Sequence, residues 1–356
     1  MADGIEFGLF DWIDFSDPAR LGAAFQQRLK LLEYADAAGY HSYHLAEHHL
    51  TPLSGVPSPG IFLAAASQRT TRIRLGALVF LLPLYHPVRL AQEICMLDHL
   101  SGGRIDLGTG RGISPHELRL LGADFNDSRG QHDEAFRILL ELLSTGKLAG
   151  FRGKHYNFDA LDIILRTVQK PYPPLWYPVI DPERAAWAGS EGINTVTLLP
   201  ANDYCRSVVD VYAEAWQANR GSSSRLNAHV AAPKFGLMRQ VYIADTHDKA
   251  LKEAKAAFDK HAWAFLYLWD VFGEAQEHAY LKDWDAQIAG GGVLVGTASE
   301  IREQVEQQLD LTGANYFVAN FTFGDLTDEQ VMRSATAFTQ EVMPRIGPAS
   351  RAFAPS

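Results

Sequence analysis

The sequence predicts an α/β protein whose strands close into a (β/α)8 barrel, the TIM barrel. Apolar segments of strand length alternate along the chain with segments whose apolar residues recur at helical spacing. We count eight strand-like segments, each followed by a helix, and repeated βα units of this kind imply a parallel sheet. Eight such units within 356 residues favour a closed barrel.

The strand assignments rest on alternation and on apolar runs. Ile5, Phe7 and Leu9 alternate with other residues, which is typical of a strand. Residues 73–82 form a strongly apolar run, and Ser101-Gly102-Gly103 make a turn before the next strand. The eight predicted strands are 5–9, 43–46, 73–82, 104–107, 175–180, 194–199, 236–244 and 316–321.

The helix assignments rest on periodicity and on end signals. The first helix follows Asp17-Pro18 and ends before Gly39, where a glycine commonly terminates a helix. A later helix starts on Asp181, which is a favoured capping residue. The predicted helices are 21–38, 61–68, 87–100, 131–145, 182–190, 204–218, 248–261, 299–311 and 327–343.

The chain is predicted to be one domain, 1–356, because no linker rich in proline, glycine or serine divides it. Residues 262–292, after the seventh strand and its helix, are rich in aromatic residues and end in Gly290-Gly291-Gly292. An insertion of this length in a barrel is usually functional, so we expect a lid hinged on these glycines. A helical hairpin that packs its aromatic residues, or a dimer contact, explains the same pattern.

Composition excludes several classes of protein. The net charge is −10 and no basic block is present, which argues against nucleic-acid binding. The longest apolar stretch, 75–84, has strand length and contains Pro83, so no membrane-spanning segment is expected. The N-terminus carries acidic residues and shows no signal peptide. Two cysteines, Cys95 and Cys205, cannot form a disulfide framework and favour the reducing cytoplasm.

The densest group of titratable residues follows the second predicted strand. His44, Glu47 and His48 satisfy H-x-x-E-H, which holds zinc when it lies on a helix. Here the preceding helix has already ended and the residues favour a strand, on which His44 and His48 point to one side and Glu47 to the other. A zinc site, a non-metal catalytic histidine and purely structural histidines are the three interpretations.

A second motif follows the fourth predicted strand. Gly108-Thr109-Gly110-Arg111-Gly112 lacks the third glycine of a dinucleotide-binding fingerprint, because Ile113 takes that position. Two interpretations remain: a flexible turn, or a loop whose amides and Arg111 bind an anion, since guanidinium matches phosphate geometry.

Residues 47–111 contain a series of short motifs with no apparent gap along it. The motifs are Glu47-His48-His49, Ala64-Ala65-Ala66, His86-Pro87-Val88-Arg89, Leu97-Asp98, Ser101, Gly103-Arg104 and Arg111-Gly112. In these motifs the chain resembles the luciferase-like flavin monooxygenases, in particular bacterial luciferase alpha subunits. The C-terminal stretch from Val295-Gly296-Thr297 to Val342-Met343-Pro344 is also similar, while the middle of the chain is more loosely related.

The resemblance implies a (β/α)8 barrel that binds reduced FMN supplied by a separate flavin reductase, uses O2, and forms a homodimer. His48 matches the catalytic histidine of the family, and an imidazole suits acid–base work near neutral pH. Leu78 and Val79 match the place of a non-proline cis peptide or bulge behind the flavin ring. Arg111 matches a ligand of the flavin phosphate.

Two positions depart from the family pattern. Gly110 stands where such luciferases have a reactive cysteine, which the chemistry does not require. Asp181-Pro182-Glu183-Arg184 stands where the family offers small hydroxyl residues to the phosphate, and Asp181 would repel that anion. Arg184 and Arg111 must then offset the repulsion, or the cofactor binds differently or weakly.

The sequence therefore predicts an FMN-dependent monooxygenase that oxidises an aldehyde or another small apolar organic substrate. His48 is the predicted catalytic residue, and Arg111 and Arg184 the predicted phosphate ligands. The alternatives are a non-catalytic flavin-binding barrel, a deazaflavin-dependent oxidoreductase and a zinc hydrolase built on His44, Glu47 and His48. Emission of light does not follow from the resemblance, and the substrate cannot be identified from the sequence.

Overall fold

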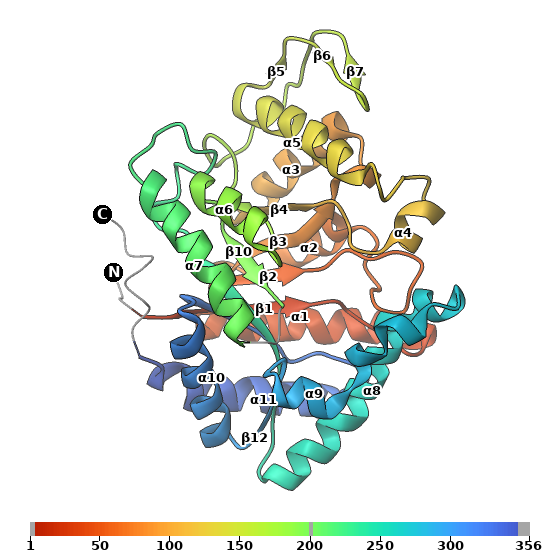
Figure 1. The fold of residues 1–356 in the computed structure, drawn as a ribbon, viewed down its shortest axis with the longest axis vertical. Coiled ribbons are helices and arrows are strands. Elements are labelled where there is room, and N and C mark those ends of the chain that lie inside the picture. Colours follow the sequence, from red (N-terminus) through yellow and green to blue (C-terminus); the bar gives the residue numbers. More distant parts are fainter. Residues whose placement is uncertain (1–3, 199–201, 348–356) are drawn as a thin grey trace.

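A parallel barrel forms the centre of the computed structural model, which describes residues 4–198 and 202–347, and helices surround the barrel (Figure 1). The strands are hydrogen-bonded in the order β10-β11-β13-β1-β2-β3-β4-β9. Tyr177 N donates to Asn194 O at 2.9 Å and Asn194 N to Leu175 O at 3.0 Å, which closes the barrel between β9 and β10. The barrel strands are β1 (Glu6–Asp11), β2 (Ser42–Leu45), β3 (Arg74–Leu81), β4 (Ile105–Gly110), β9 (Leu175–Trp176), β10 (Thr195–Thr197), β11 (Phe235–Ile243) and β13 (Tyr316–Asn320).

The predicted (β/α)8 barrel is confirmed, and each of the eight predicted strands overlaps a barrel strand. Residue 199 of the sixth predicted strand lies outside the described residues.

No helix in the described ranges is long and apolar enough to cross a lipid bilayer. The helices around the barrel are α1 (Leu21–Ala38), α2 (Pro59–Ser67), α3 (Pro87–Ser101), α4 (Pro115–Leu120), α5 (Ser128–Thr145), α6 (Pro182–Glu191), α7 (Asn202–Asn219), α8 (His247–Val271), α9 (Trp284–Ala289), α10 (Ala298–Thr312) and α11 (Asp328–Ala337).

Some elements were not predicted. A further strand, β12 (Val293–Gly296), extends the sheet beside the end of β11, and the short α4 follows β4. Two small antiparallel pairs lie after α5, away from the barrel (Figure 1). They are formed by β5 (Lys147–Leu148) with β8 (Leu161–Asp162) and by β6 (Phe151–Arg152) with β7 (Asn157–Phe158).

The predicted helix 248–261 is too short, because α8 continues to Val271. Ala262, Ala264, Leu266 and Leu268 are buried, so the apolar face of the helix continues into the predicted insertion 262–292. A 3-10 helix (Ala275–Lys282) and α9 make up most of the remainder. The segment is thus largely helical, and its opening as a lid stays a prediction.

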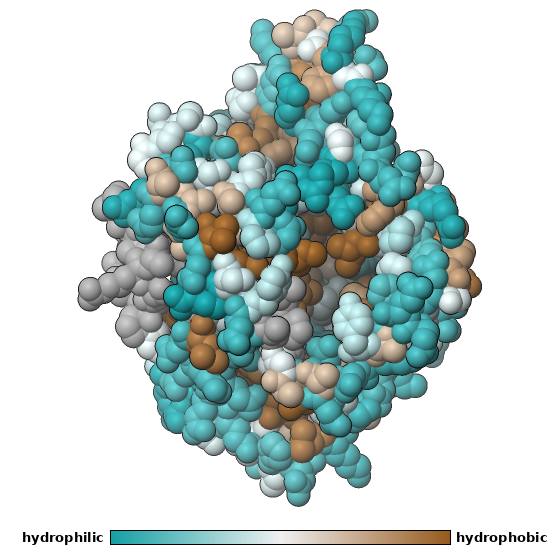
Figure 2. All heavy atoms as spheres, in the orientation of Figure 1, coloured by the Kyte–Doolittle hydropathy of each residue, from teal (hydrophilic) through white to brown (hydrophobic). Residues whose placement is uncertain are grey.

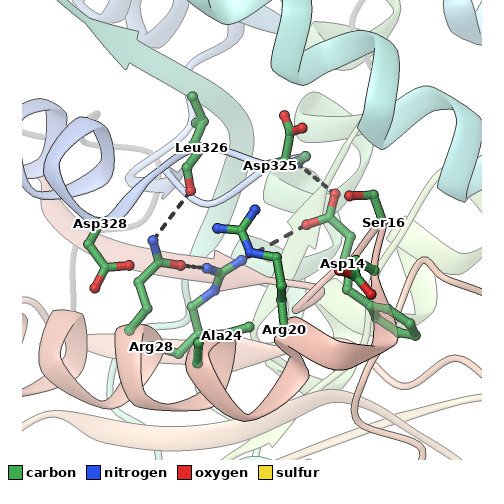
Figure 3. A pocket seen from close by; sticks show the side chains of 13 residues that line it. Asp14, Ser16, Arg20, Ala24, Arg28, Asp325, Leu326 and Asp328 are labelled. Atoms are coloured by element: carbon green, nitrogen blue, oxygen red, sulfur yellow. Dashed lines mark hydrogen bonds and ion pairs between the residues drawn. The ribbon is translucent and has the colours of Figure 1, made fainter.

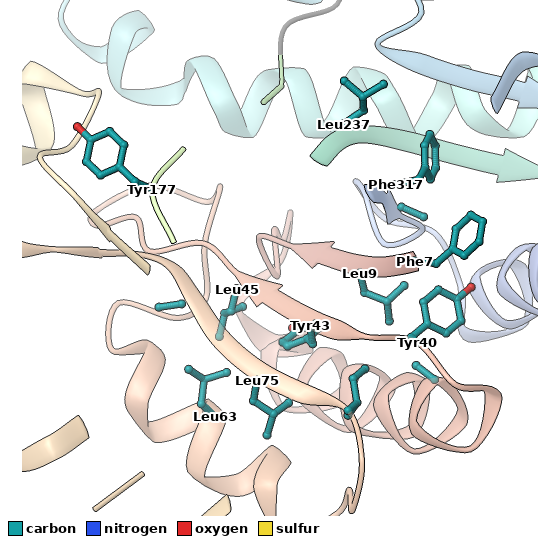
Figure 4. Close-up of a cluster of buried hydrophobic side chains, with 14 of the residues drawn as sticks. Phe7, Leu9, Tyr40, Tyr43, Leu45, Leu63, Leu75, Tyr177, Leu237 and Phe317 are labelled. Atoms are coloured by element: carbon teal, nitrogen blue, oxygen red, sulfur yellow. The ribbon is translucent and has the colours of Figure 1, made fainter. Parts of the chain in front are cut away.

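Alternation along the strands creates two apolar layers. Side chains that point outward from the strands, such as Phe7 and Leu9 of β1 and Phe317 of β13, pack beneath the helices (Figure 4). Side chains that point inward, such as Phe10, Trp176 and Tyr316, fill the barrel. The interior is therefore packed and leaves chemistry to the ends of the strands.

His44 of β2 belongs to this inner layer. Its Nε2 lies 3.0 Å from the hydroxyl of Tyr316, and its ring packs on Trp176 with 4.6 Å between centroids. Burial lowers the pKa of His44 to about 3, so the imidazole is neutral at ordinary pH.

A buried ionic network joins the end of β1 to α1 and α8. Arg28 Nε lies 3.0 Å from Asp11 Oδ2, and its Nη2 lies 4.0 Å from Asp14 Oδ1. Asp14 Oδ2 also accepts from Gly324 N at 2.7 Å and lies 2.8 Å from Nδ1 of His261 on α8. Figure 3 shows Arg28 and Asp14 beside the loop that follows β13. The network fixes the strand end that carries Trp12.

Substituting Arg28→Met removes the cation from between two buried carboxylates. We expect the free energy of unfolding to fall by about 3–5 kcal/mol, because those charges lose their compensation. Denaturant unfolding of both proteins measures this difference. Lys30→Met is the matched control, since this exposed lysine of the same helix forms only a surface pair with Asp328 at 4.0 Å. Equal stability of Arg28→Met and wild type would contradict the assignment.

The buried His44 makes stability depend on pH. Below about pH 6.5 the unfolded chain protonates this imidazole while the folded protein does not, down to about pH 3. Stability is therefore lost as pH falls, by about 2 kcal/mol from about pH 7.5 to about pH 5. The variant His44→Gln should lack this component, whereas the exposed His86→Gln should keep it. Parallel stability–pH curves for His44→Gln and wild type would argue against a neutral His44.

Candidate active site

One cavity of about 320 Å³ lies at the carboxyl ends of strands β1–β4 and β9. This volume is within the usual range for small-molecule sites, about 300–1,000 Å³. Figure 2 shows one face of the molecule hollowed near its middle, with hydrophobic residues around the hollow. All seven residues that the sequence nominates line the cavity: His48, Leu78, Val79, Gly110, Arg111, Asp181 and Arg184.

The part of the cavity near β1 and β3 is apolar. Phe10 and Trp12 line it from the end of β1, and Leu78, Val79 and Leu81 line it from β3. The peptide bond between Leu78 and Val79 is cis, and the register between β3 and β4 shifts between Ala77 and Phe80. The backbone irregularity expected at this position is present.

Gly110 lies directly against Val79. A Cβ atom placed on Gly110 would come within 2.6 Å of Val79 Cγ2, closer than real side chains approach. Glycine is therefore required here while Val79 keeps its position. A cysteine at position 110 would meet the same close contact.

His48 is held by a carboxylate from another element. Its Nδ1 lies 2.9 Å from Oε1 of Glu117 on α4, and His49 N donates to Glu117 Oε2 at 2.9 Å. The Glu117 side chain is 5% exposed and that of His48 is 12% exposed. A carboxylate beside Nδ1 favours the tautomer that carries its proton on this atom, which makes Nε2 the acceptor nitrogen of the ring.

Glu47 and His44 do not join His48 in one site. Glu47 Oε1 lies 2.8 Å from His49 Nε2, and its Oε2 accepts from Tyr85 OH at 2.9 Å and Leu81 N at 3.2 Å. Burial raises the pKa of Glu47. His44 faces Tyr316 inside the barrel. The three residues of the H-x-x-E-H pattern thus have separate partners, and no group of three metal-ligating side chains occurs within residues 4–198 and 202–347.

Three arginines gather at one end of the cavity. Arg111 follows β4, Arg129 lies in the first turn of α5 and Arg184 lies in the first turn of α6. Burial lowers the pKa of Arg111, and the charges of Arg129 and Arg184 lower it further. Arg184 Nε is buried without a hydrogen-bond partner among the described residues. The cluster therefore has capacity to bind an anion.

Two carboxylates accompany this arginine cluster. Asp133 Oδ2 lies 3.8 Å from Arg184 Nη2 and Asp133 Oδ1 lies 2.9 Å from His132 Nδ1. Asp181 lines the cavity itself and caps α6, since its Oδ1 accepts from Arg184 N at 2.9 Å. The predicted helix start at Asp181 is confirmed, and Asp181 lines the cavity together with the three arginines.

A second cavity of about 230 Å³ adjoins the first. His48, Glu117 and Phe265 line both cavities, so the imidazole stands between them. Trp269 and Tyr280, both from the aromatic segment 262–292, line the second cavity only. Part of the predicted lid thus forms the wall of a space next to His48.

Sequence reasoning missed Glu117 and Arg129. Each follows a loop and lies on a helix, where charged residues are common and have no special pattern. Ser114 was a usable signal for Glu117, because Ser114 and Glu117 have the spacing of a helix cap, and Ser114 Oγ accepts from Glu117 N at 3.3 Å.

Comparison with known proteins identifies the family. Residues 5–316 match the family model described as luciferase-like monooxygenase. An uncharacterized protein of Sinorhizobium fredii, y4wF, is 38% identical over 96% of this chain and 98% of its own length. Limonene 1,2-monooxygenase of Rhodococcus erythropolis is 28% identical over 98% and 89% of the two chains. The oxygenase component of flavin-dependent trigonelline monooxygenase from Acinetobacter baylyi is 26% identical over 69% and 67%.

Solved structures share the fold. Monooxygenase RslO1 from Streptomyces bottropensis has a TM-score of 0.82 and 25% identity, and the match covers 96% of this chain and 99% of that one. The oxygenating constituent of 3,6-diketocamphane monooxygenase from Pseudomonas putida, in complex with FMN, has a TM-score of 0.76 and 20% identity over 97% and 99%. An F420-dependent secondary alcohol dehydrogenase has a TM-score of 0.72 and 18% identity over 96% and 98%. Because the family model matches most of the chain, this protein belongs to the luciferase-like monooxygenase family and is an oxidoreductase.

Proposed function

We propose that the protein is the oxygenase component of a two-component, FMN-dependent monooxygenase. It takes reduced FMN from a separate flavin reductase and inserts one atom of O2 into an aldehyde or another small apolar organic substrate. The observation that carries the proposal is a single cavity that combines an apolar wall, a carboxylate-held imidazole and three arginines. The flavin-dependent relative that is itself an oxygenase component supports the need for a reductase.

The residues of the cavity fit FMN. Arg184 Nε has no partner within the described chain, and together with Arg111 and Arg129 it would hold the phosphate. Leu78 and Val79 would support the flat ring system from β3. When bound, reduced FMN supplies the two electrons with which O2 gives one oxygen atom to the substrate and one to water.

His48 is the proposed acid–base residue. With Nδ1 bound to Glu117, its Nε2 can accept a proton from a reacting group and return it. Glu117 is a positioning residue, because it contacts Nδ1 of His48 and orients the imidazole, although it also lines both cavities. The buried contact keeps the ring in one tautomer, which is the usual effect of a carboxylate behind a histidine.

The second cavity is the proposed substrate site. Its lining includes Leu53, Phe265 and Trp269, which suit an apolar molecule and exclude water from the space beside His48. The titratable side chains on its lining are Glu117, which contacts His48, and the histidines His48 and His278. An apolar substrate is therefore favoured over an anionic one.

We further propose a homodimer in the cytoplasm. Large apolar side chains of α2 and α3 face the solvent, since Ile61 is 75% exposed, Met96 56% and Leu100 47%. Exposed apolar side chains of this size suit contact with a second copy. Cys95 and Cys205 are both free and buried, which suits a reducing compartment.

Removing Arg111 should weaken FMN binding far more than riboflavin binding. In Arg111→Ala we expect the Kd for FMN to rise about 10- to 100-fold, because charge-assisted hydrogen bonds to the phosphate are lost. Titration by flavin fluorescence measures both ligands, and Arg89→Ala, on the exposed side of α3, is the control. Equal weakening for FMN and riboflavin would place the phosphate elsewhere. Tighter binding of a deazaflavin than of FMN would favour that cofactor.

Removing His48 should impair turnover and leave flavin binding intact. In His48→Gln we expect product formation to fall about 10²- to 10⁴-fold, the usual contribution of acid–base catalysis. Assays contain NADH, a flavin reductase, FMN and a panel of aldehydes and cyclic apolar compounds, with His99→Gln as control. If wild type yields only hydrogen peroxide with every compound, the non-catalytic alternative holds. Stoichiometric zinc in the purified protein would support the hydrolase alternative.

A further inference from the structure

The carboxylate of Asp181 is placed where it opposes the binding of an anion. It lines the cavity together with Arg111, Arg129 and Arg184. It also interacts with Arg111, because burial and the charges of Arg129 and Arg184 lower the pKa of Arg111 and the charge of Asp181 opposes this shift. The same cavity end thus contains both the cations that attract a phosphate and an anion that repels it.

The net positive charge at this end of the cavity is smaller than the negative charge of a phosphate monoester. Three guanidinium groups with the carboxylates of Asp181 and Asp133 leave one net positive charge. A phosphate monoester carries about −1.5 to −2 at neutral pH. Without the charge of Asp181 the cluster would carry two positive charges and would match the ligand.

The structure of the helix does not require this charge. Asp181 caps α6 through one oxygen, which accepts from Arg184 N at 2.9 Å. Asparagine and serine cap helices about as well as aspartate. The favourable interaction of a negative charge with a helix start is small and screened by salt. The cap of α6 therefore does not account for a charged residue at position 181.

We propose that Asp181 limits the affinity of the site for the flavin phosphate, so that flavin exchanges with the solution between turnovers. The inference rests on the proposed function, in which reduced flavin arrives from a reductase and oxidised flavin must return to it. A tightly held cofactor would slow this exchange, since differences in affinity for related ligands appear mostly in the rate of dissociation. Asp181 is thus a determinant of affinity and takes no part in the transfer of oxygen.

The test is the variant Asp181→Asn, which keeps the cap and removes the charge. We expect the Kd for FMN to fall about tenfold or more, with slower dissociation, because the repulsion between like charges is lost. Riboflavin, which has the same ring and no phosphate, should bind equally to both proteins. Fluorescence titration and stopped-flow dissociation with oxidised flavins measure these quantities without turnover.

Glu183→Gln is the matched control, since Glu183 is an exposed carboxylate in the same helix turn and does not line the cavity. It should leave both affinities unchanged. Thermal unfolding tests whether Asp181→Asn is folded. If that variant does not fold, Asp181→Ser is used in its place, because serine also caps helices.

The outcomes separate this inference from the proposed function. Wild type that binds FMN and forms product, with unchanged FMN affinity in Asp181→Asn, overturns the inference alone. Weaker FMN binding in the variant makes Asp181 a ligand and also overturns it, as does an equal gain for riboflavin. If wild type binds neither flavin, the inference and the proposed function both fail.

Discussion

Closure of a parallel barrel is the constraint on which the site depends. All eight strands run in one direction, so their carboxyl ends form one rim, and residues far apart in the sequence meet there. Inside the barrel, Trp176, Tyr316 and His44 are buried and contact one another. A chain folded in this way has to place its chemistry in the loops and helix starts above the rim, and His48 and Arg184 lie there although 136 residues separate them.

The sequence could predict the parts of this arrangement that have a local pattern. Alternation and apolar runs located the eight strands, and Asp181 and Gly39 marked helix ends that the structure reproduces. Contacts between distant elements have no local pattern. Glu117 contacts His48 across 69 residues, and only the path of α4 above the rim brings the carboxylate to the imidazole. The extension of α8 was missed because the aromatic residues after residue 261 were assigned to an inserted lid, although the buried face of the helix continues through them.

The H-x-x-E-H pattern shows why letters alone do not define a site. On a helix the two histidines would share a face. Here the His44 side chain lies inside the barrel against Tyr316, and His48, beyond the end of β2, lines the cavity. Glu47 stabilises the loop after β2, since its carboxylate contacts His49, Tyr85 and the backbone of Leu81. This stabilisation has a consequence for His48: the neighbours on both sides are held, so the imidazole faces Glu117 from a fixed backbone.

The two carboxylates at the cavity, Glu117 and Asp181, differ in how their charges are used. Each oxygen of Glu117 has a hydrogen-bond partner, one at His48 Nδ1 and the other at His49 N. Both oxygens are therefore satisfied before any ligand binds. One oxygen of Asp181 is satisfied by the start of α6, and its charge remains within reach of the arginine cluster. In the proposed function, the first arrangement prepares His48 for a proton transfer. The second is the charge that we propose lowers the stability of the complex with an anionic ligand, so that flavin can return to a separate reductase.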